Sequence, residues 1–298
     1  MNKSAGRANG QTLAFPASTH EEDPGMSTAW IIASGKGGVG KSTITACLGA
    51  AMAREGRSVC IVDADIGLRD QDVLLGVENR IVFDLLDVAN GVCTLEEALI
   101  TPDVSSRLSL LPASQFARAK ELEPKAFRKL LAALKERFDA VLIDCPAGIE
   151  RSVRGLMNGL IEEAIVICTA DDVCIRNAER VCSVMEKKGL PRPQLIVNRL
   201  APELIRAGEM YSAATVAATL DLQLLGEIPE DQSVYRAALK HMSPMDVDCE
   251  ARRAFTRIAW RMLGADVEAP LPGYGTEKRP WYRRLFHPNL KEVKRIDR

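Results

Sequence analysis

The stretch Ser34-Gly35-Lys36-Gly37-Gly38-Val39-Gly40-Lys41-Ser42-Thr43 determines how the rest of the sequence is interpreted. Its glycines allow successive backbone N–H groups to turn inward around an anion, and larger side chains would block that shape. Lys41 is placed to reach the β- and γ-phosphates of a nucleotide, and Ser42 is placed to offer its hydroxyl to Mg²⁺. The sequence therefore predicts a phosphate-binding loop that runs from Gly35 through Thr43.

The residues on either side of this loop have the context that a phosphate-binding loop requires. An apolar run at residues 30–33 predicts a buried strand before it. After it, residues 42–54 carry apolar side chains at helical spacing and predict a helix whose positive dipole end faces the phosphates. The order of strand, glycine loop and helix favours a nucleotide site over an ordinary glycine-rich turn.

Composition and charge narrow the class of protein. The chain has 298 residues, of which 47% are hydrophobic, so it can bury a full core. A formal net charge of −1 gives no global attraction to nucleic acid, which is not expected as a partner. Eight cysteines occur without a C-x-x-C pair, which argues against zinc or iron–sulfur ligation and favours a reduced, cytoplasmic protein. No apolar run has the length of a transmembrane segment.

Beyond the loop, strand and helix patterns alternate to about residue 264. The predicted strands lie at 58–62, 107–111, 139–144, 164–169, 194–198 and 222–228. The predicted helices lie at 82–89, 124–137, 175–188, 232–240 and 250–263. Repeated strand–helix units of this kind predict an α/β fold, a mostly parallel sheet with helices on both faces, of the P-loop NTPase type.

Acidic residues follow two of these strands. Asp63 and Asp65 come directly after the strand at 58–62, and Asp144 ends the strand at 139–144. Because ligands of open α/β sheets bind beyond the carboxyl ends of the strands, these carboxylates are expected to face the same phosphate site. An acid at the end of such a strand is also the second acidic element expected of a P-loop NTPase, so Asp144 is predicted to lie near the metal.

Five separated motifs resemble the MinD and ParA ATPases. The additional lysine, Lys36, makes residues 35–43 similar to the deviant Walker A loop of that family. Residues 63–69, which read Asp-Ala-Asp-Ile-Gly-Leu-Arg, resemble the MinD branch, since ParA proteins usually have D-x-D-P-Q there. Residues 111–115, 144–150 and 228–234 each look like MinD segments, in MinD order. The resemblance covers about residues 28–265 and implies a septum site-determining ATPase that hydrolyses ATP with Mg²⁺.

The resemblance also implies roles for single residues. Lys36 would reach across an ATP-bound homodimer to the partner's nucleotide, as an arginine finger does, and would act in catalysis with Lys41 and Asp65. Asp65 would orient the attacking water. The metal would be held by Ser42, Asp63 and Asp144, and Asn198 would contact the adenine. The nucleotide-binding residues implied in total are Gly35, Lys36, Gly37, Gly38, Val39, Gly40, Lys41, Ser42, Thr43 and Asn198.

One position departs from the MinD pattern. Asn177 follows Arg176, where MinD proteins usually carry an aspartate. In the family this region lies near the dimer and partner-binding surface. The resemblance implies MinC-type and MinE-type protein partners, and the missing charge weakens the MinE inference while leaving hydrolysis unaffected.

The two ends of the chain differ in composition from the centre. We expect a disordered arm at 1–26, in which Met26 is also a plausible start, an ATPase domain at 27–266 and a linker at 267–277.

Residues 278–298 hold eight Lys or Arg and two acidic residues, and Trp281, Tyr282, Leu285 and Phe286 share one helical face beside Arg283 and Arg284. This pattern predicts an amphipathic helix on an anionic membrane, similar to the C-terminal helix of MinD proteins. The protein is thus expected to be cytoplasmic and reversibly peripheral on the cytoplasmic face of the cell membrane.

Other functions remain open at this stage. A flagellar-number regulator of the FlhG type has the same ATPase fold, and only its partners would separate it. A ParA-like DNA-partition ATPase would bind DNA in a salt-dependent manner, but the missing D-x-D-P-Q and the aromatic tail argue against it. An iron–sulfur reductase of the nitrogenase type would need cysteines in a matching context, which this sequence lacks.

Overall fold

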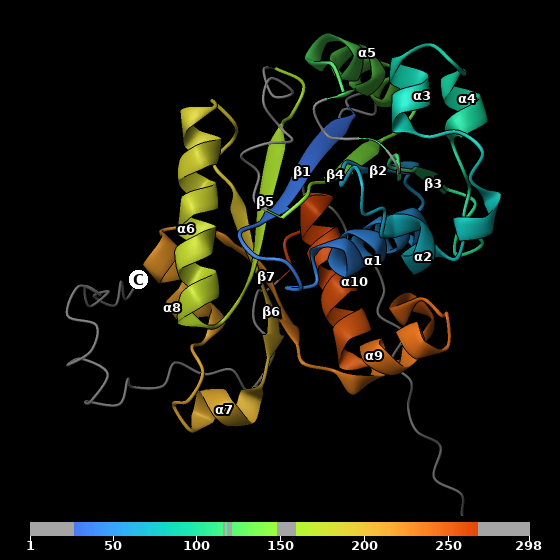
Figure 1. Ribbon diagram of the computed structural model, residues 1–298. Helices are drawn as coiled ribbons and strands as arrows, with labels where there is room; N and C mark the ends of the chain where they lie inside the picture. Colours follow the sequence, from blue (N-terminus) through green and yellow to red (C-terminus); the bar gives the residue numbers. More distant parts are fainter. Residues whose placement is uncertain (1–26, 116, 118–120, 148–158, 268–298) are drawn as a thin grey trace, which may run out of the picture.

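The protein is described here from a computed structural model that covers residues 27–115, 117, 121–147 and 159–267 (Figure 1). At its centre lies one seven-stranded sheet with the strand order β3-β2-β4-β1-β5-β6-β7, in which every pairing is parallel. The strands are β1 (Thr28–Ser34), β2 (Val59–Asp63), β3 (Leu108–Leu111), β4 (Ala140–Asp144), β5 (Glu163–Thr169), β6 (Gln194–Leu200) and β7 (Leu224–Pro229). The predicted parallel α/β sheet is confirmed.

The strands form where short apolar runs rich in β-branched residues occur. All five residues of β2 and of β4 are buried, as are the central five of β5. Strands that are covered on both faces show continuous hydrophobic runs of this kind. The predicted strands therefore agree with the observed ones to within a few residues at each end.

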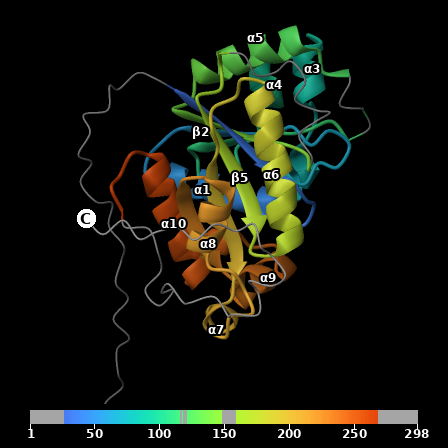
Figure 2. The same ribbon diagram turned by 90° about the vertical axis from the view of Figure 1, so that its left-hand side faces the viewer.

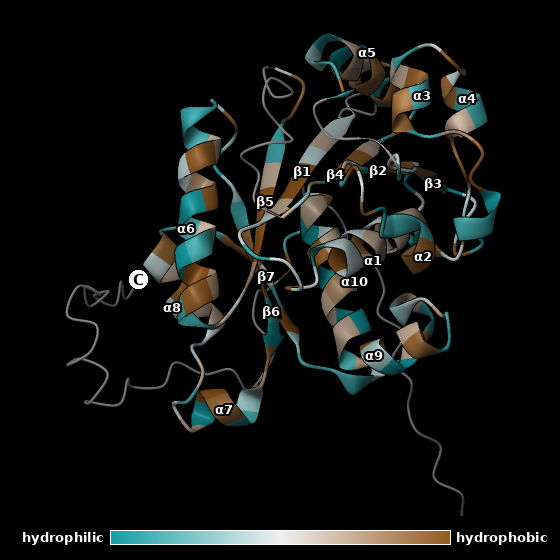
Figure 3. Cartoon of the chain, in the orientation of Figure 1, coloured by the Kyte–Doolittle hydropathy of each residue, from teal (hydrophilic) through white to brown (hydrophobic). Residues whose placement is uncertain are grey.

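Helices cover both faces of the sheet. The helices α1 (Lys41–Arg54) and α10 (Glu250–Met262) pack against each other on one face, and α10 also packs on β7. The opposite face carries α5 (Pro124–Lys135), α6 (Asp172–Lys187) and α8 (Ala213–Leu220) (Figure 2). Polar and apolar residues alternate along α6 (Figure 3). Its buried residues lie at helical spacing, namely Cys174, Ala178, Val181 and Met185.

Several short helices differ from the sequence-based expectation. The helix predicted at 82–89 begins only at Leu85, because Asp84 accepts hydrogen bonds from the backbone N–H groups of Leu86 and Asp87 and caps the helix there. The helices α2 (Gln71–Leu75), α4 (Leu95–Ala98), α7 (Pro202–Arg206) and α8 were not predicted. The rest are the 3₁₀ turns η1 (Glu78–Arg80) and η3 (Pro244–Asp246) and the helices α3 (Leu85–Ala89) and α9 (Gln232–Leu239). Short helices give too few turns for a periodic pattern to stand out.

The strand order places the loops after β1, β2 and β4 together. In chain order β1 is followed by β2, but in the sheet β4 lies between them, and β5 lies on the other side of β1. The connection after β1 therefore runs toward the β3 edge of the sheet, and the later strands β5, β6 and β7 are added toward the opposite edge. Such a reversal opens a crevice beyond the carboxyl ends of the strands. The register pairs Asp63 of β2 directly with Asp144 of β4 at that edge.

Candidate functional site

The glycine loop joins β1 to α1, and its backbone conformation requires glycine. Gly38 and Gly40 have φ values of 78° and 92°, a region that side chains disfavour. A Cβ atom on Gly40 would lie 2.6 Å from Nδ2 of Asn198. A Cβ atom on Gly35 would lie 2.4 Å from the backbone carbonyl carbon and oxygen of Asn177 in α6. The loop thus fits tightly between β6 and α6.

The helix α1 begins at Lys41 without a capping side chain. Gly40 is the N-cap residue and makes no side-chain hydrogen bond, and the first turn contains no acidic residue. The positive end of the helix dipole is therefore not neutralised by the helix's own side chains. A helix start of this kind, preceded by turned backbone N–H groups, is suited to bind phosphate.

Lys41 is buried and forms an ion pair with Asp144. The distance from Lys41 Nζ to Asp144 Oδ1 is 2.5 Å, and the side chains are 7% and 1% exposed. Burial by itself lowers the pKa of the Lys41 ammonium group, but the adjacent Asp144 carboxylate outweighs burial, so the pKa is raised. Lys41 Nζ also donates to Ser42 Oγ at 3.3 Å. The Lys41 ammonium group therefore remains charged in the buried site.

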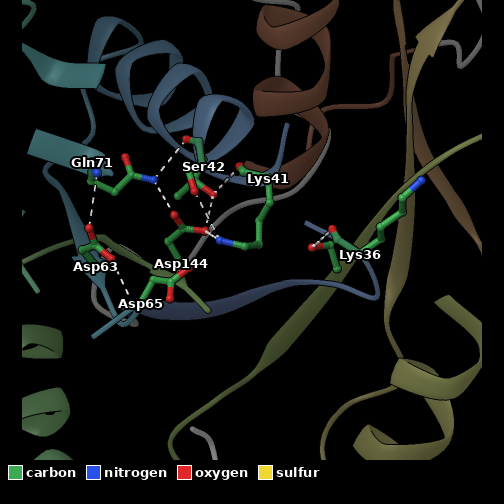
Figure 4. A network of polar contacts seen from close by, with 9 residues as sticks. Lys36, Lys41, Ser42, Asp63, Asp65, Gln71 and Asp144 are labelled. Carbon is green, nitrogen blue, oxygen red and sulfur yellow. Dashed lines mark hydrogen bonds and ion pairs between the residues drawn. The ribbon is translucent and has the colours of Figure 1, made fainter. Parts of the chain in front are cut away.

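Asp144 accepts two further hydrogen bonds. Thr45 Oγ1 lies 3.5 Å from Oδ1, and Gln71 Nε2 donates to Oδ2 at 2.6 Å (Figure 4). Gln71 Nε2 also donates to the backbone carbonyl of Ser42 at 3.0 Å. Neither Gln71 nor Thr45 was predicted from the sequence. Thr45 lies one helical turn after Lys41, a spacing that could have indicated it, whereas no local pattern marks Gln71.

Asp63 lies beside Asp144 at the end of β2 and is fully buried. Its carboxylate accepts hydrogen bonds from the backbone N–H groups of Asp65 at 3.0 Å and Gln71 at 3.2 Å. Burial and the neighbouring Asp144 charge together raise the pKa of Asp63 to about 7. A positive charge that bound nearby would favour the ionised form of this carboxyl group.

Asp65 lies two residues further on and is only partly buried. Burial raises the pKa of its carboxyl group, and the positive charge of Lys41 partly counteracts this effect. In Figure 4, Asp63, Asp65, Asp144, Lys41 and Ser42 converge on one region. The structure therefore brings together the residues that were predicted to hold the metal and to orient water, although the roles themselves stay predictions.

Lys36 lies at the other end of the loop and is exposed. Its backbone carbonyl accepts a hydrogen bond from Ser34 Oγ at 3.1 Å, while its side chain extends away from Lys41 and Asp144 (Figure 4). Across the described ranges, no hydrogen bond or ion pair holds the Lys36 ammonium group, although its charge contributes to the lowered pKa of Asp171 at the start of α6. The two lysines of the loop thus have opposite environments.

Asn198 lies at the carboxyl end of β6 and is buried. Its side-chain amide donates to the backbone carbonyl of Val39 at 2.7 Å, so it contacts the phosphate loop directly. The next residue, Arg199, has a φ of 55°, and the pairing of β6 with β7 is irregular there. The predicted contact of Asn198 with adenine stays a prediction.

The remaining predicted nucleotide-binding residues, Gly37, Val39, Ser42 and Thr43, all lie in the loop or in the first turn of α1. The oxygen-rich set formed by the Ser42 hydroxyl and the carboxylates of Asp63 and Asp144 suits Mg²⁺, which prefers oxygen ligands and is usually held by few protein groups together with phosphates. Within the ranges that the structure covers, no group of three or more His, Cys, Asp or Glu residues forms a ready metal cluster.

The predicted membrane-binding residues at 281–286 and the predicted arm at 1–26 lie outside the described residues. None of the described helices is both long enough and apolar enough to span a bilayer. The eight cysteines are all free, and Cys145, which follows Asp144, is buried.

Comparisons with known proteins identify the family. A family model for ParA, described as an NUBPL iron-transfer P-loop NTPase, matches residues 25–263. The septum site-determining protein MinD of Helicobacter pylori is 42% identical over 252 residues, which cover 82% of this chain and 93% of that protein.

Two solved structures are similar over the same region. The MinC:MinD cell division protein complex of Aquifex aeolicus matches with a TM-score of 0.73 and 32% identity, over 84% of this chain and all of that chain. MinD of Pyrococcus horikoshii, complexed with Mg-ADP, matches with a TM-score of 0.70 and 28% identity, over 81% of this chain and all of that chain. Together with the phosphate loop and the acidic residues beside it, these matches show that the chain belongs to the MinD family of ParA-type P-loop ATPases.

Proposed function

We propose that this protein is an ATP-hydrolysing peripheral membrane protein that dimerises when ATP is bound and helps to place the cell-division septum by inhibiting misplaced division. The septum role is carried over from its relatives, which are septum site-determining proteins. The observation that most supports the catalytic part is the contrast between Lys41, which is buried against Asp144, and Lys36, which is exposed. We assign the buried lysine to the subunit's own nucleotide and the exposed lysine to the nucleotide of a second subunit.

In the proposed reaction, the bound Mg²⁺ supplies positive charge to the phosphates, and the protein supplies position. Lys41 leaves Asp144 for the β- and γ-phosphates, while the backbone N–H groups of the loop surround them. Asp65 orients the attacking water. Lys36 of one subunit neutralises charge on the nucleotide of the other, so hydrolysis depends on dimerisation.

The proposed partners follow from the same relatives. The structure of the Aquifex aeolicus MinC:MinD complex supports a MinC-type partner. A MinE-type activator is proposed with the qualification that Asn177 replaces the family's usual aspartate. The region 278–298 is proposed as a membrane-targeting tail, joined to the ATPase domain at 27–266 by a linker at 267–277.

A single tail is expected to bind an anionic membrane weakly, because each basic residue near the surface contributes only about 1 kcal/mol. Two tails in a dimer bind more strongly, since linking two sites raises the overall affinity by about 10² or more. ATP binding would therefore recruit the protein to the cytoplasmic face of the cell membrane, and hydrolysis would release it.

Co-sedimentation with anionic liposomes tests this cycle. We expect the full-length protein to pellet with ATP, to remain in the supernatant with ADP, and to lose ATP-dependent pelleting when Trp281 and Phe286 are both changed to alanine. The matched control changes Leu271 and Tyr274, which lie in the predicted linker, and should pellet like the unchanged protein. Pelleting that persists in ADP would contradict the membrane cycle.

The same preparation separates the rival functions. If the protein shifts the electrophoretic mobility of DNA in an ATP-dependent and salt-sensitive manner but does not pellet with liposomes, this would indicate a ParA-like partition protein. ATP hydrolysis without binding to either membrane or DNA would favour the flagellar-number regulator. A specific hydrolysis rate that rises with protein concentration is expected for a dimerising ATPase, and a constant rate would contradict dimerisation.

A further inference from the structure

Gln71, the first residue of α2, is completely buried beside the phosphate site. It contacts all three residues that were predicted to hold the metal. Its side-chain amide donates to the backbone carbonyl of Ser42 at 3.0 Å and to Asp144 Oδ2 at 2.6 Å. Its backbone N–H donates to Asp63 Oδ2 at 3.2 Å. One residue thus joins α1, β2 and β4 at the point where the metal is expected.

The hydrogen bonds to Asp144 are divided between its two oxygens. Lys41 Nζ and Thr45 Oγ1 both approach Oδ1, at 2.5 Å and 3.5 Å, whereas among the described residues Gln71 is the one side chain that donates to Oδ2 (Figure 4). When Lys41 moves to the phosphates, Oδ1 loses its close donor. A buried carboxylate that lacks hydrogen-bond donors destabilises the fold. The donor from Gln71 does not depend on Lys41 and can remain.

We infer that Gln71 is a positioning residue for Mg²⁺ binding, which holds Asp144 by Oδ2 so that Oδ1 is the oxygen available to the hydrated metal. The same amide group fixes the backbone of Ser42, whose hydroxyl is the predicted protein ligand. Groups that orient metal-binding residues in this way typically change metal affinity or activity by 10- to 100-fold when they are removed. Gln71 touches neither nucleotide nor water in this role and acts only through Asp144 and Ser42.

The other end of the Gln71 amide shows that this arrangement is not optimal for stability. Its carbonyl oxygen, Oε1, is buried and has no hydrogen-bond partner within the described residues. An unsatisfied buried acceptor destabilises a fold, and an apolar side chain of similar size would avoid this loss. A glutamine that served only to fill space would therefore be replaceable by methionine without any effect on metal binding.

The inference rests on the ATPase assignment and not on the proposed role at the septum or the membrane. It is tested with the full-length variant Gln71→Met, which keeps the unbranched shape but removes the side-chain amide that donates to Ser42 and Asp144. The matched control is Gln223→Met, since Gln223 is exposed at the opposite end of the sheet, before β7. The measurement is the fluorescence of N-methylanthraniloyl-ADP bound to the protein, first in EDTA and then during titration with MgCl₂.

We expect the Mg²⁺ concentration at half-saturation to rise about 10-fold or more in Gln71→Met. Nucleotide affinity in EDTA should stay within about twofold of the unchanged protein, because the loop is intact, and the control should differ in neither quantity. The melting temperature in EDTA is measured alongside, because the variant removes the orphaned oxygen but leaves Asp144 Oδ2 and the Ser42 carbonyl without the amide donor. An unchanged half-saturation would overturn the inference, and so would an equal loss of affinity with and without Mg²⁺.

A second background shows whether Gln71 acts through Asp144. In the Asp144→Asn variant, the additional change Gln71→Met should alter the Mg²⁺ half-saturation by less than about twofold, because the group that Gln71 holds has changed. An additional 10-fold change in that background would overturn the assigned route. If Gln71→Met does not fold, the variant Gln71→Leu is measured in the same way with Gln223→Leu as its control.

Discussion

The two ends of the phosphate loop differ in the exposure and the hydrogen bonds of their lysines. At the Lys41 end, the side chains of Lys41 and Gln71 are buried and both donate hydrogen bonds to the buried Asp144. At the Lys36 end, the side chain is exposed and extends away from that network (Figure 4). The difference teaches that one loop of nine residues joins an internal, hydrogen-bonded site to an exposed lysine, and we propose that this lysine serves a second subunit.

The largest effect is expected when the internal end is broken with Lys41→Ala. Hydrolysis should fall by about 10³-fold, since one charge-stabilising donor at a reaction centre is worth roughly 10² to 10³. The nucleotide-free protein should also lose about 3 kcal/mol of its free energy of unfolding, because Asp144 is left as a buried charge without its cation. Phosphate release and urea unfolding measure the two effects.

The double variant Lys41→Ala and Asp144→Asn serves as the control for that loss of stability. It removes the uncompensated charge, so it should recover much of the stability without recovering hydrolysis. If both single and double variants are equally unstable, the ion pair between Lys41 and Asp144 does not account for the loss.

The external end is tested with Lys36→Ala. Hydrolysis should fall by about 10³-fold, as when an arginine finger is removed, while the free energy of unfolding stays within about 0.5 kcal/mol. Mixing this variant with Asp65→Asn should restore part of the activity, because an intact Lys36 of one subunit can then serve a nucleotide beside an intact Asp65. No recovery on mixing would show that Lys36 acts within its own subunit.

A smaller effect is expected from the glycines that border Lys36. Gly35→Ala should lower the free energy of unfolding by about 1–3 kcal/mol, because its Cβ atom would lie 2.4 Å from the backbone of Asn177. Gly37→Ala is the matched control, since no atom lies within 4 Å of a Cβ built there. Urea unfolding of the nucleotide-free proteins should give a lower free energy of unfolding for Gly35→Ala than for Gly37→Ala. Equal free energies would mean that α6 moves to accommodate the added methyl group.

The smallest effect over a single step, here one pH unit, concerns the pH dependence of stability in the nucleotide-free protein. Asp63 has a pKa of about 7 in the folded protein, whereas an aspartate in the unfolded chain titrates at about 3.9. Between these values the folded chain binds more protons, so the free energy of unfolding falls as the pH rises, by at most about 1.4 kcal/mol per pH unit.

Asp63→Asn should remove this contribution. Urea unfolding between pH 4 and pH 8 should then show a flatter dependence on pH for the variant than for the unchanged protein. The variant Asp70→Asn is a nearby control, because Asp70 is exposed. A variant with an unchanged slope would show that Asp63 is ionised throughout this range.

Much of the fold could be predicted because the strands are short apolar runs that alternate with amphipathic helices. The α/β class and the parallel sheet are confirmed, and the predicted strand at 139–144 differs from β4 by one residue. The unpredicted helices α2 and α7 have five residues each, which is too short for a helical period to be recognised. Pro202 at the start of α7 was the available signal.

In the candidate site, too, some features could be predicted from the sequence and others could not. The sequence by itself determined the phosphate loop, because the glycines, Lys41 and Ser42 act through neighbouring backbone atoms, so their spacing along the chain is sufficient. It also determined the acids at the strand ends, since all parallel strands end at one edge of the sheet. Only the tertiary structure decided that Gln71 joins Ser42 to Asp144 and that Asn177 lies against Gly35. The physical reason is that these contacts join segments far apart in the chain, and their geometry depends on how α2 and α6 pack on the sheet.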